Sequence, residues 1–526
     1  MANQLFARKR LSVLLEEMAG EHRLRRVLGP VALTSLGVGA IIGTGIFVLT
    51  GIAAHDKTGP ALMLSFVVSG IACIFAALCY AEFASMVPVA GSAYTYAYAT
   101  LGELFAWIIG WDLILEYAVA SSTVAHGWSH YFQDFIGMMG MKVPAIFSRA
   151  PFDYDPAIGE FISTGAWFDL PAILIAGLVT VILVIGIRES AGFNAVMVIV
   201  KLIIVLFVIA VGSFFVDPAN WKPFAPFGLT GVSFFGNTLF GQTGAGGEPL
   251  GMLAGAAVIF FAYIGFDSVS THAEEAKNPR RDVPIGIIVS LILCTVLYIA
   301  VAAVLTGMVP YKDINIDAPV SDAFGRIGLP WARFLISLGA VTGITSVLLV
   351  MMLSQPRVLL AMARDGLLPT SFFGAVHDRF RTPWKSTIVT GVFVATVAAF
   401  VPLRILADLV NIGTLLAFVI VCGAVLVMRR TNPDAERPFR APFVPLTPIL
   451  GIGLCLLLMF SLPPENWTRL AVWLLIGFAI YFGYSRRHSR LGKELAHEIA
   501  RHGVSPAGSP VTHTGKRPDD RDAPRG

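Results

Sequence analysis

The residues of this sequence that could hold a charged molecule lie inside long apolar segments. The first such segment, residues 37–47, reads GVGAIIGTGIF and places four glycines within nine positions. Each glycine weakens an α-helix by about 1 kcal/mol relative to alanine, so the pattern is compatible with an unwound stretch at 42–45. Backbone N–H groups at the start of the following half-helix would face an anion there. Close helix packing through Gly39 and Gly43 is the alternative interpretation.

A second interruption lies in a later apolar segment, where residues 260–268 read FFAYIGFDS. Gly265 predicts a break near the middle of this helix, and Asp267 is placed to cap the half-helix that follows. Without such a role, inserting a carboxylate at this depth of the membrane would cost about 2.5–3.5 kcal/mol of free energy. The first interruption lies in the first apolar run of the chain and the second in the sixth, so the two helices are five apart. Because successive membrane-crossing helices alternate in direction and five is odd, these two helices run in opposite directions. A glycine-interrupted pair at matching positions of two inverted halves is typical of a transporter binding site.

Other ionisable residues also fall within apolar segments. Lys201 lies about nine residues, roughly 14 Å, inside the fifth segment, so it must pair, lose its proton, or act as a structural lysine that never titrates. Glu116 lies near the middle of the third segment. Asp112 and Glu82 lie nearer the ends of their segments, where a salt bridge or a cap is expected. His126 lies close to the opposite interface, where we expect it to reach the lipid headgroups.

The composition requires a membrane for these segments. The chain has 526 residues, of which 56% are hydrophobic and 14% charged, and its mean hydropathy is +0.74. Charged side chains normally make up roughly 25% of a soluble domain. The composition excludes a nucleic-acid binder, a secreted disulfide scaffold and a disordered chain. The five cysteines all lie in apolar runs, so neither a metal site nor a disulfide framework is expected.

Twelve apolar runs approach the roughly 20 residues that a membrane-crossing helix needs. They are 31–53, 61–86, 103–131, 169–187, 192–215, 250–272, 284–308, 331–356, 384–401, 403–428, 446–462 and 468–484. These runs divide the chain into an N-terminal segment (1–30), a first set of five helices (31–215), an outer loop (216–249), a second set (250–428), two further helices (446–484) and a mostly disordered tail (485–526). The segments 132–168 and 216–249 are expected to be loops with short surface helices.

The basic residues predict the orientation. With the N-terminus in the cytoplasm, 28 of the 38 Lys and Arg residues fall on the cytoplasmic side and 9 on the opposite side, leaving Lys201 within a helix. Because Lys and Arg concentrate in cytoplasmic loops, both termini are expected in the cytoplasm. Residues 1–30 contain no apolar core after their basic cluster, so no cleavable signal peptide is expected.

Several motifs together resemble one known family. They are 37–47 (GVGAIIGTGIF), 80–92 (YAEFASMVPVAGS), 110–117 (GWDLILEY), 260–267 (FFAYIGFD), 274–284 (EEAKNPRRDVP) and 363–369 (ARDGLLP). The set resembles the amino acid–polyamine–organocation superfamily, and within it the bacterial relatives of cationic amino acid transporters. This resemblance implies an all-α integral membrane protein with 12 transmembrane helices. Ten would form a five-plus-five inverted repeat with broken helices 1 and 6, followed by two C-terminal helices.

The resemblance also implies a site for an amino acid zwitterion. Its carboxylate would meet the backbone at Ile42, Gly43, Thr44 and Gly45, and its ammonium would meet carbonyls at Phe261, Ala262 and Ile264. Simple packing is the alternative role for Phe261. Glu116 would lie beneath the site, where it balances a cationic side chain, or Lys201 through water. Ile344 would form part of the pocket floor, and its bulk argues against full arginine transport.

By the same resemblance, Lys201 would occupy the place of the ion that sodium-coupled relatives of the fold bind. Its neighbours would be the carbonyls of Gly39 and Ile42 and the hydroxyls of Thr345 and Ser346, so it would couple transport to protons.

The sequence therefore predicts a secondary active permease of the cell membrane, either a proton-coupled symporter or an exchanger, for a cationic or small neutral L-amino acid. No enzyme activity, cofactor or nucleic acid is expected. The partners are the amino acid, protons and the lipid bilayer, and a small membrane subunit is left open. A membrane sensor that binds amino acids without moving them would carry the same motifs. The Gly-x-Ser-Gly motif of an intramembrane protease is absent from the sequence. A transporter built from two six-helix halves would place its two breaks six helices apart, not five. A channel is not indicated, because the sequence has no filter-like repeat.

Overall fold

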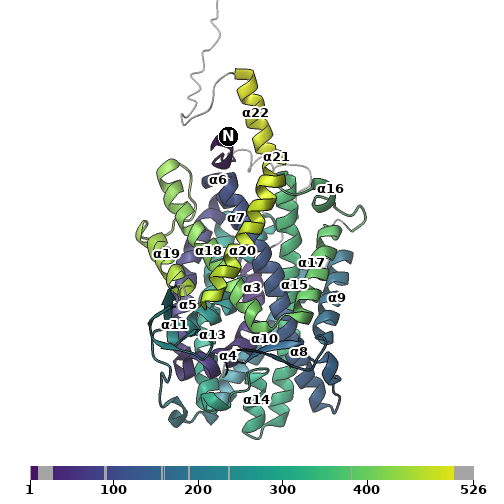
Figure 1. The fold of residues 1–526 in the computed structure, drawn as a ribbon, viewed down its shortest axis with the longest axis vertical. Coiled ribbons are helices and arrows are strands. Elements are labelled where there is room, and N and C mark those ends of the chain that lie inside the picture. The colour runs from purple at the N-terminus through teal and green to yellow at the C-terminus, as the bar shows by residue number, and fades with distance from the viewer. Residues whose placement is uncertain are drawn as a thin grey trace, which may run out of the picture.

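The computed structural model describes residues 2–9, 28–87, 92–155, 158, 160–186, 190–234, 237–380 and 382–502. They form an elongated bundle of helices (Figure 1). Within this described part, eight helices are long and apolar enough to cross a membrane, and four shorter apolar helices accompany them. The structure is that of a mainly helical membrane protein, as the sequence predicts. The expected disordered tail beyond about 503 and residues 10–27 lie outside the described residues.

The helices that build the bundle follow the expected runs closely. In chain order the α-helices are α1 (Ala2–Leu5), α3 (Pro30–Ile41), α4 (Thr50–Ala53), α5 (Leu62–Met86), α6 (Ser92–Thr100), α7 (Glu103–Ile114), α8 (Ala120–Met138), α9 (Leu170–Ile185), α10 (Ser190–Gly212), α11 (Met252–Ile259), α12 (Ser268–Thr271), α13 (Pro279–Met308), α14 (Pro319–Arg326), α15 (Pro330–Arg364), α16 (Thr370–Phe373), α17 (Trp384–Phe400), α18 (Leu403–Thr431), α19 (Leu446–Met459), α20 (Pro464–Ile480), α21 (Arg486–His488) and α22 (Arg490–His502). Short π-helical stretches are η1 (Gly45–Leu49), η2 (Ala54–Thr58), η4 (Leu115–Val119) and η11 (Tyr481–Ser485), and η8 (Phe260–Tyr263) is a 3₁₀ turn. Pro402 separates α17 from α18.

Two helices are broken where the glycines predict it. The first is α3, which ends at Ile41 and resumes as η1 and α4. The second is α11, which passes through η8 and resumes as α12. These segments occupy the middle of the bundle, because α3 packs on α13, α10 and α15, while α11 packs on α5 and α18. The helix pairs α9–α17 and α18–α19 pack outside them.

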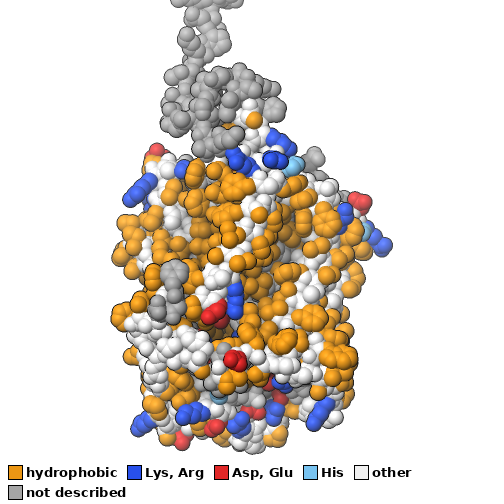
Figure 2. Space-filling model, in the orientation of Figure 1, with side chains coloured by type: hydrophobic (Ala, Val, Ile, Leu, Met, Phe, Trp, Pro, Cys, Tyr) orange, Lys and Arg blue, Asp and Glu red, His pale blue; other side chains and the backbone are white. Residues whose placement is uncertain are grey.

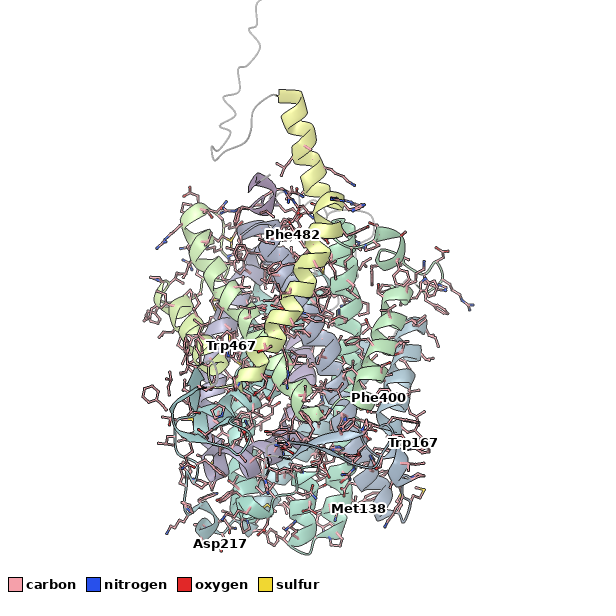
Figure 3. All side chains as sticks on the ribbon, viewed as in Figure 1. Met138, Trp167, Asp217, Phe400, Trp467 and Phe482 are labelled. Atoms are coloured by element: carbon pink, nitrogen blue, oxygen red, sulfur yellow. The ribbon has the colours of Figure 1, made fainter. Side chains whose placement is uncertain are left out.

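The two ends of the bundle differ in structure. One end, called here the terminal face, carries α1 and α21–α22 (Figure 1), where Gln4 Nε2 donates to the carbonyl of Arg486 at 2.8 Å. The other end, called the opposite face, carries α14, and Figure 3 places Met138 and Asp217 there while Phe482 lies toward the terminal face. Figure 2 shows apolar side chains over much of the visible face, with Lys and Arg gathered toward both ends, as a lipid-embedded protein requires.

The segments between the long helices agree with expectation in part. Residues 132–168 and 216–249 contain the expected short helices, η5 (Ala145–Phe147) and η7 (Pro218–Trp221). They also contain antiparallel strands that were not expected: β1 (Phe152–Asp155) pairs with β2 (Glu160–Ser163), and β3 (Val232–Phe234) pairs with β4 (Asn237–Phe240). The third pair is β5 (Gln242–Thr243) with β6 (Pro249–Leu250). Strand pairing satisfies the backbone polar groups of these segments without a helix. The helix α6 was also not expected, because its residues fall between two apolar runs.

Candidate substrate site at two helix breaks

The break in the first helix changes the partners of three backbone carbonyls. In an unbroken α-helix the carbonyls of Gly39, Ile41 and Ile42 would accept from the amides four residues ahead. Here Ile42 is extended, with φ −73° and ψ 102°, so the helix cannot continue. Buried carbonyls require other donors, and side chains from two neighbouring helices supply them.

Lys201 and Tyr298 are these donors. Lys201 Nζ on α10 donates to the carbonyl of Gly39 at 2.6 Å and to that of Ile42 at 2.9 Å. The hydroxyl of Tyr298 on α13 donates to the carbonyl of Ile41 at 2.8 Å. Both side chains are fully buried. The unwound stretch is therefore held by one amine and one phenol.

The same break leaves three amides without backbone acceptors. Within the described part of the chain, the N–H groups of Gly43, Thr44 and Gly45 donate to no carbonyl, whereas those of Ile46 and Phe47 resume bonding at the carbonyl of Gly43. Gly43, Thr44 and Gly45 are all buried. An unsatisfied buried N–H costs about 1–3 kcal/mol, so three in succession form a strong site for an anion.

The two broken helices touch at their breaks. A Cβ built on Gly45 would lie 2.3 Å from Ala262 Cα, and one built on Gly265 would lie 2.9 Å from the carbonyl oxygen of Ala40. Gly265 has φ +113°, a conformation that glycine adopts without strain. Each break therefore rests against the backbone of the other, and only glycine permits both approaches.

The carbonyls on the second break are partly used. The carbonyl of Phe261 accepts from the amide of Ile264 at 3.1 Å, and that of Ala262 accepts from the Tyr298 hydroxyl at 3.1 Å. A carbonyl oxygen has two lone pairs, so each keeps one acceptor site. The single hydroxyl proton of Tyr298 is thus shared between the two breaks and ties them together. The Asn411 amide adds support, because its Nδ2 donates to the carbonyls of Ala257 at 2.9 Å and Val258 at 3.0 Å.

The environment of Lys201 differs in part from expectation. The amine bonds to Gly39 and Ile42, but within the described residues it makes no hydrogen bond to Thr345 or Ser346. Thr345 instead accepts from Trp128 Nε1 at 2.9 Å, and Ser346 donates to the carbonyl of Gly343 at 2.9 Å. The α15 face that meets the Lys201 stem is Gly343, where a Cβ would lie 3.4 Å from Lys201 Cβ. This is ordinary contact distance, so α15 packs directly against the lysine stem at this position.

A group of carboxyls lies beside the second break. Glu116 is 1% exposed, and both of its oxygens lack a hydrogen-bond partner within the described chain, as do both oxygens of Asp112. Asp267 and Thr414 are electrostatic neighbours of Glu116. No Lys or Arg forms an ion pair with these three acids among the described residues, and the expected balance of Glu116 with Lys201 through water stays a prediction.

Asp267 does not act as the helix cap that its position predicts. It stands at the N-cap position of α12 but makes no capping side-chain bond. Its carboxylate instead accepts a hydrogen bond from the Tyr117 hydroxyl on η4. A partner from another helix has replaced the local one, and the bond ties the third helix to the second break.

Three further sequence expectations concern residues around the site. Ile344 is fully buried, and its place on the floor of a side-chain pocket stays a prediction. Glu82 forms the expected salt bridge, accepting from Arg429 Nε at 2.8 Å and Nη2 at 2.7 Å. His126 does not reach the headgroups, because it is 4% exposed and its Nδ1 lies 3.3 Å from the carbonyl of Ala398.

Sequence reasoning missed Tyr298, Tyr117 and Asn411. All three lie in runs of apolar residues, where a tyrosine or asparagine signals nothing by its spacing. Their role depends on which neighbouring helix they face, and only the packed structure shows it.

Comparisons with known proteins give consistent results. The model of the family described as "Amino acid permease" matches residues 28–482. The chain is 48% identical over 494 residues to the branched-chain amino acid permease BcaP of Bacillus subtilis (strain 168), covering 94% of this chain and 100% of the relative. It is 46% identical over 491 residues to the methylthioribose transporter of the same organism, covering 93% and 100%. It is 40% identical over 439 residues to the vacuolar cationic amino acid transporter 4 of Arabidopsis thaliana, covering 82% and 68%.

Proposed function

The chain belongs to the amino acid permease family, and from this premise we propose that it is a secondary active carrier of an L-amino acid working by alternating access. The observation that carries the proposal is the run of three buried amides at Gly43, Thr44 and Gly45 without acceptors. An α-carboxylate supplies acceptors for all three. The ammonium of the same molecule bonds to the free lone pairs of the Phe261 and Ala262 carbonyls, and to the Ile264 carbonyl, across the break.

The proposed architecture has 12 transmembrane helices, with ten in two inverted sets of five. The eight long helices and four shorter apolar ones support this count when the part of Gly45–Met86 that precedes α5 is joined to Pro30–Ile41 as the first helix. The terminal face is proposed to lie in the cytoplasm of a cell membrane, because 28 of the 38 Lys and Arg residues belong to that side.

Lys201 is the proposed coupling group. Its amine makes two hydrogen bonds that hold the unwound stretch, and a deprotonated amine would hold the same carbonyls less tightly because charge-assisted hydrogen bonds are about twice as strong. Loss of the proton toward the cytoplasm would therefore loosen the first helix and release the substrate. This predicts uptake driven by protons and indifferent to sodium.

The substrate is proposed to be a cationic or small neutral L-amino acid. Two relatives bear the names of branched-chain and cationic amino acid carriers, whose substrates share the α-amino acid group that the amide–carbonyl site suits, so the side-chain pocket sets the choice between them. A third relative is named a methylthioribose transporter, and methylthioribose has no such group, so it belongs in the test. In this proposal Glu116 favours a cationic side chain, and Ile344 limits its length.

The test is uptake into proteoliposomes with an imposed inward proton gradient. The panel contains leucine, alanine, lysine, arginine and methylthioribose, each with and without sodium. Gradient-driven accumulation of an amino acid supports the proposal, and accumulation of methylthioribose alone refutes the amino acid assignment. Binding without either uptake or counterflow of labelled amino acid would identify a sensor instead of a carrier.

A further inference from the structure

A tyrosine of α8 holds the first broken helix just beyond the three free amides. The hydroxyl of Tyr131 donates to the carbonyl of Phe47 at 2.7 Å, and its ring meets the Phe47 ring edge to face, with 5.9 Å between the ring centroids. Tyr131 is fully buried. Phe47 belongs to the π-helical stretch η1 and lies two residues after Gly45. Tyr131 therefore fixes the backbone of η1 through both its ring and its hydroxyl.

Tyr131 belongs to one side of α8 that follows the first helix toward the opposite face. The residues on this side are spaced three and four apart, as neighbours on one side of an α-helix are: Val124, Gly127, Tyr131 and Asp134. The carbonyl of Val124 accepts from Thr44 Oγ1 at 3.5 Å. Gly127 leaves room for Thr44, because a Cβ built there would lie 2.3 Å from Thr44 Cγ2. This side of α8 thus begins at one of the three free amides.

The other end of this side of α8 holds the helix α14. Asp134 accepts from Ser321 Oγ of α14 at 2.9 Å and from Ser337 Oγ of α15 at 2.6 Å. Helix α14 also packs on η1 and α4. Its first residue, Pro319, lies against Gly51, since a Cβ built on Gly51 would lie 2.7 Å from Pro319 Cβ. At the opposite face (Figure 1), α14 therefore covers the half of the first helix that follows the break.

The Tyr131 hydroxyl reaches α14 as well as the first helix. Helix α14 has no side-chain N-cap, and the amides of Val320 and Ser321 make no backbone hydrogen bond within the described chain. Both amides interact with the Tyr131 hydroxyl. A phenol has one proton to donate and lone pairs that accept, so the bond to Phe47 uses the proton and leaves the lone pairs for α14. Hydrogen bonds linked in this way strengthen each other.

We propose that Tyr131 is a positioning residue that links binding of the amino acid to closure of α14 over the opposite face. The inference rests on the proposed function, because it needs a carboxylate at the amides of Gly43, Thr44 and Gly45. A bound carboxylate fixes η1 and, with it, the carbonyl of Phe47. That carbonyl holds the Tyr131 proton, so the hydroxyl oxygen is directed at the first amides of α14. Without the carboxylate η1 is held less firmly, and α14 opens more readily.

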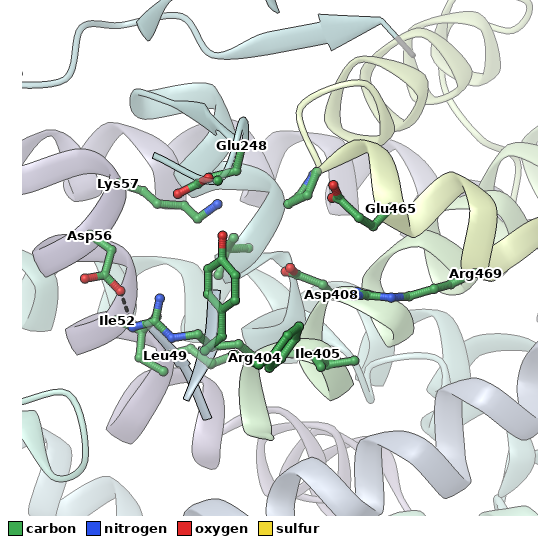
Figure 4. A pocket seen from close by; sticks show the side chains of 16 residues that line it. Leu49, Ile52, Asp56, Lys57, Glu248, Arg404, Ile405, Asp408, Glu465 and Arg469 are labelled. Carbon is green, nitrogen blue, oxygen red and sulfur yellow. Dashed lines mark ion pairs between the residues drawn. The ribbon is translucent and has the colours of Figure 1, made fainter. Parts of the chain in front are cut away.

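The experiment measures access to the opposite face through the substitution Ile52→Cys. Ile52 lies on α4, is 6% exposed and lines the cavity of about 220 Å³ that Figure 4 shows, while the five natural cysteines are all buried. The rate of labelling by a membrane-impermeant methanethiosulfonate reagent is measured on the purified full-length chain, with and without L-leucine or L-lysine. Uptake is measured in proteoliposomes.

Two phenylalanine variants are compared in the Ile52→Cys chain. Tyr131→Phe keeps the ring and removes the hydroxyl. Tyr311→Phe is the matched control, because Tyr311 lies in the turn before α14 and its hydroxyl makes no hydrogen bond within the described chain.

We expect the amino acid to slow labelling in the Ile52→Cys chain and in the Tyr311→Phe control. In Tyr131→Phe we expect fast labelling whether or not the amino acid is present, and a KM of uptake about tenfold higher, the factor that corresponds to 1.4 kcal/mol. A purely structural role for the hydroxyl would lower stability without removing the effect of the amino acid on labelling. Slowed labelling and an unchanged KM in Tyr131→Phe, beside normal uptake by the parent chain, would overturn the inference alone. A parent chain that shows neither uptake nor slowed labelling with either amino acid would overturn the proposed function, and the inference with it.

Ser321→Ala keeps the test decisive if Tyr131→Phe does not purify as a single species. This change frees α14 from Asp134 and leaves the bond between Tyr131 and Phe47 in place. The amino acid should therefore bind with unchanged affinity, while labelling of Ile52→Cys in its presence becomes faster. Labelling as slow as in the parent chain would show that α14 does not close the opposite face, and the inference would fall.

Discussion

Gly45→Ala is the sharpest test of the central site, because it adds one methyl group at the contact between the two breaks. The new Cβ would lie 2.3 Å from Ala262 Cα and 2.5 Å from Ala262 Cβ, whereas ordinary contact begins at 3.4 Å. The obstacle is backbone, which cannot rotate away. Relief requires η1 and η8 to separate by about 1 Å, and overpacking of this kind costs about 1–3 kcal/mol.

The functional effect should exceed the loss of stability. A displacement of about 1 Å of the groups that position a ligand can reduce the function of a site about 100-fold. Here the displaced groups are the amides that are proposed to meet the carboxylate. We therefore expect Gly45→Ala to reach the membrane and to bind its amino acid about 100-fold more weakly. The assays are thermal unfolding in detergent and equilibrium binding on the same preparation.

Other glycines supply a graded series. A Cβ on Gly43 would meet Val347 Cγ2 at 2.7 Å; this β-branched side chain turns little but is not backbone, so Gly43→Ala should have an intermediate effect. A Cβ on Gly423 or Gly453 would meet nothing within 4 Å, so alanine there should leave binding unchanged and add up to about 1 kcal/mol of helix stability. Wild-type affinity in Gly45→Ala, or equal losses across the series, would refute the close approach of the two breaks.

Three further changes test the groups around the breaks. Lys201→Met keeps the length of the side chain without its charge and should abolish accumulation driven by a pH gradient in proteoliposomes; accumulation at the wild-type level would eliminate Lys201 as the coupling group. Tyr298→Phe removes the donor to two carbonyls and should lower stability by about 1–3 kcal/mol, measured by thermal unfolding, while Phe at the uninvolved Tyr484 should not. Glu116→Gln should weaken lysine binding more than alanine binding, and equal losses would make Glu116 a structural residue.

The positions of the two breaks could be predicted because their cause is local. Glycine at 265 permits a positive φ that other residues resist, and glycine at 45 permits the close approach of another backbone; a run of such glycines is readable from the letters alone. The depth of Lys201 is similarly readable from the length of the apolar run around it. These features depend on chain distance along one helix, which the sequence fixes without any knowledge of neighbouring helices.

The partners of side chains were predicted less well, because they depend on which helix faces which. Asp267 stands at the predicted N-cap position, but its carboxylate does not bond to the backbone of its own helix. It accepts a hydrogen bond from the Tyr117 hydroxyl of another helix instead. His126 was assigned to the interface from its place in the run, yet α17 covers it with the carbonyl of Ala398. The hairpins of 152–163 and 232–250 were not predicted from the sequence, because their short strands lack a sustained alternation of apolar and polar residues.

Lys201 and Tyr298 hold the unwound stretch in different ways, and this difference bears on how the proposed carrier could change conformation. Both donors satisfy carbonyls of the same unwound stretch, but a phenol remains neutral in ordinary conditions while an amine can gain or lose charge. Tyr298 also bonds to Ala262, so it holds the two breaks together in either protonation state of the lysine. Lys201 bonds only to the first break. In the proposed mechanism, a change of charge at Lys201 would thus act on the amides proposed to meet the carboxylate while Tyr298 keeps the carbonyl side in place, so that one end of the substrate would be released without dismantling the site.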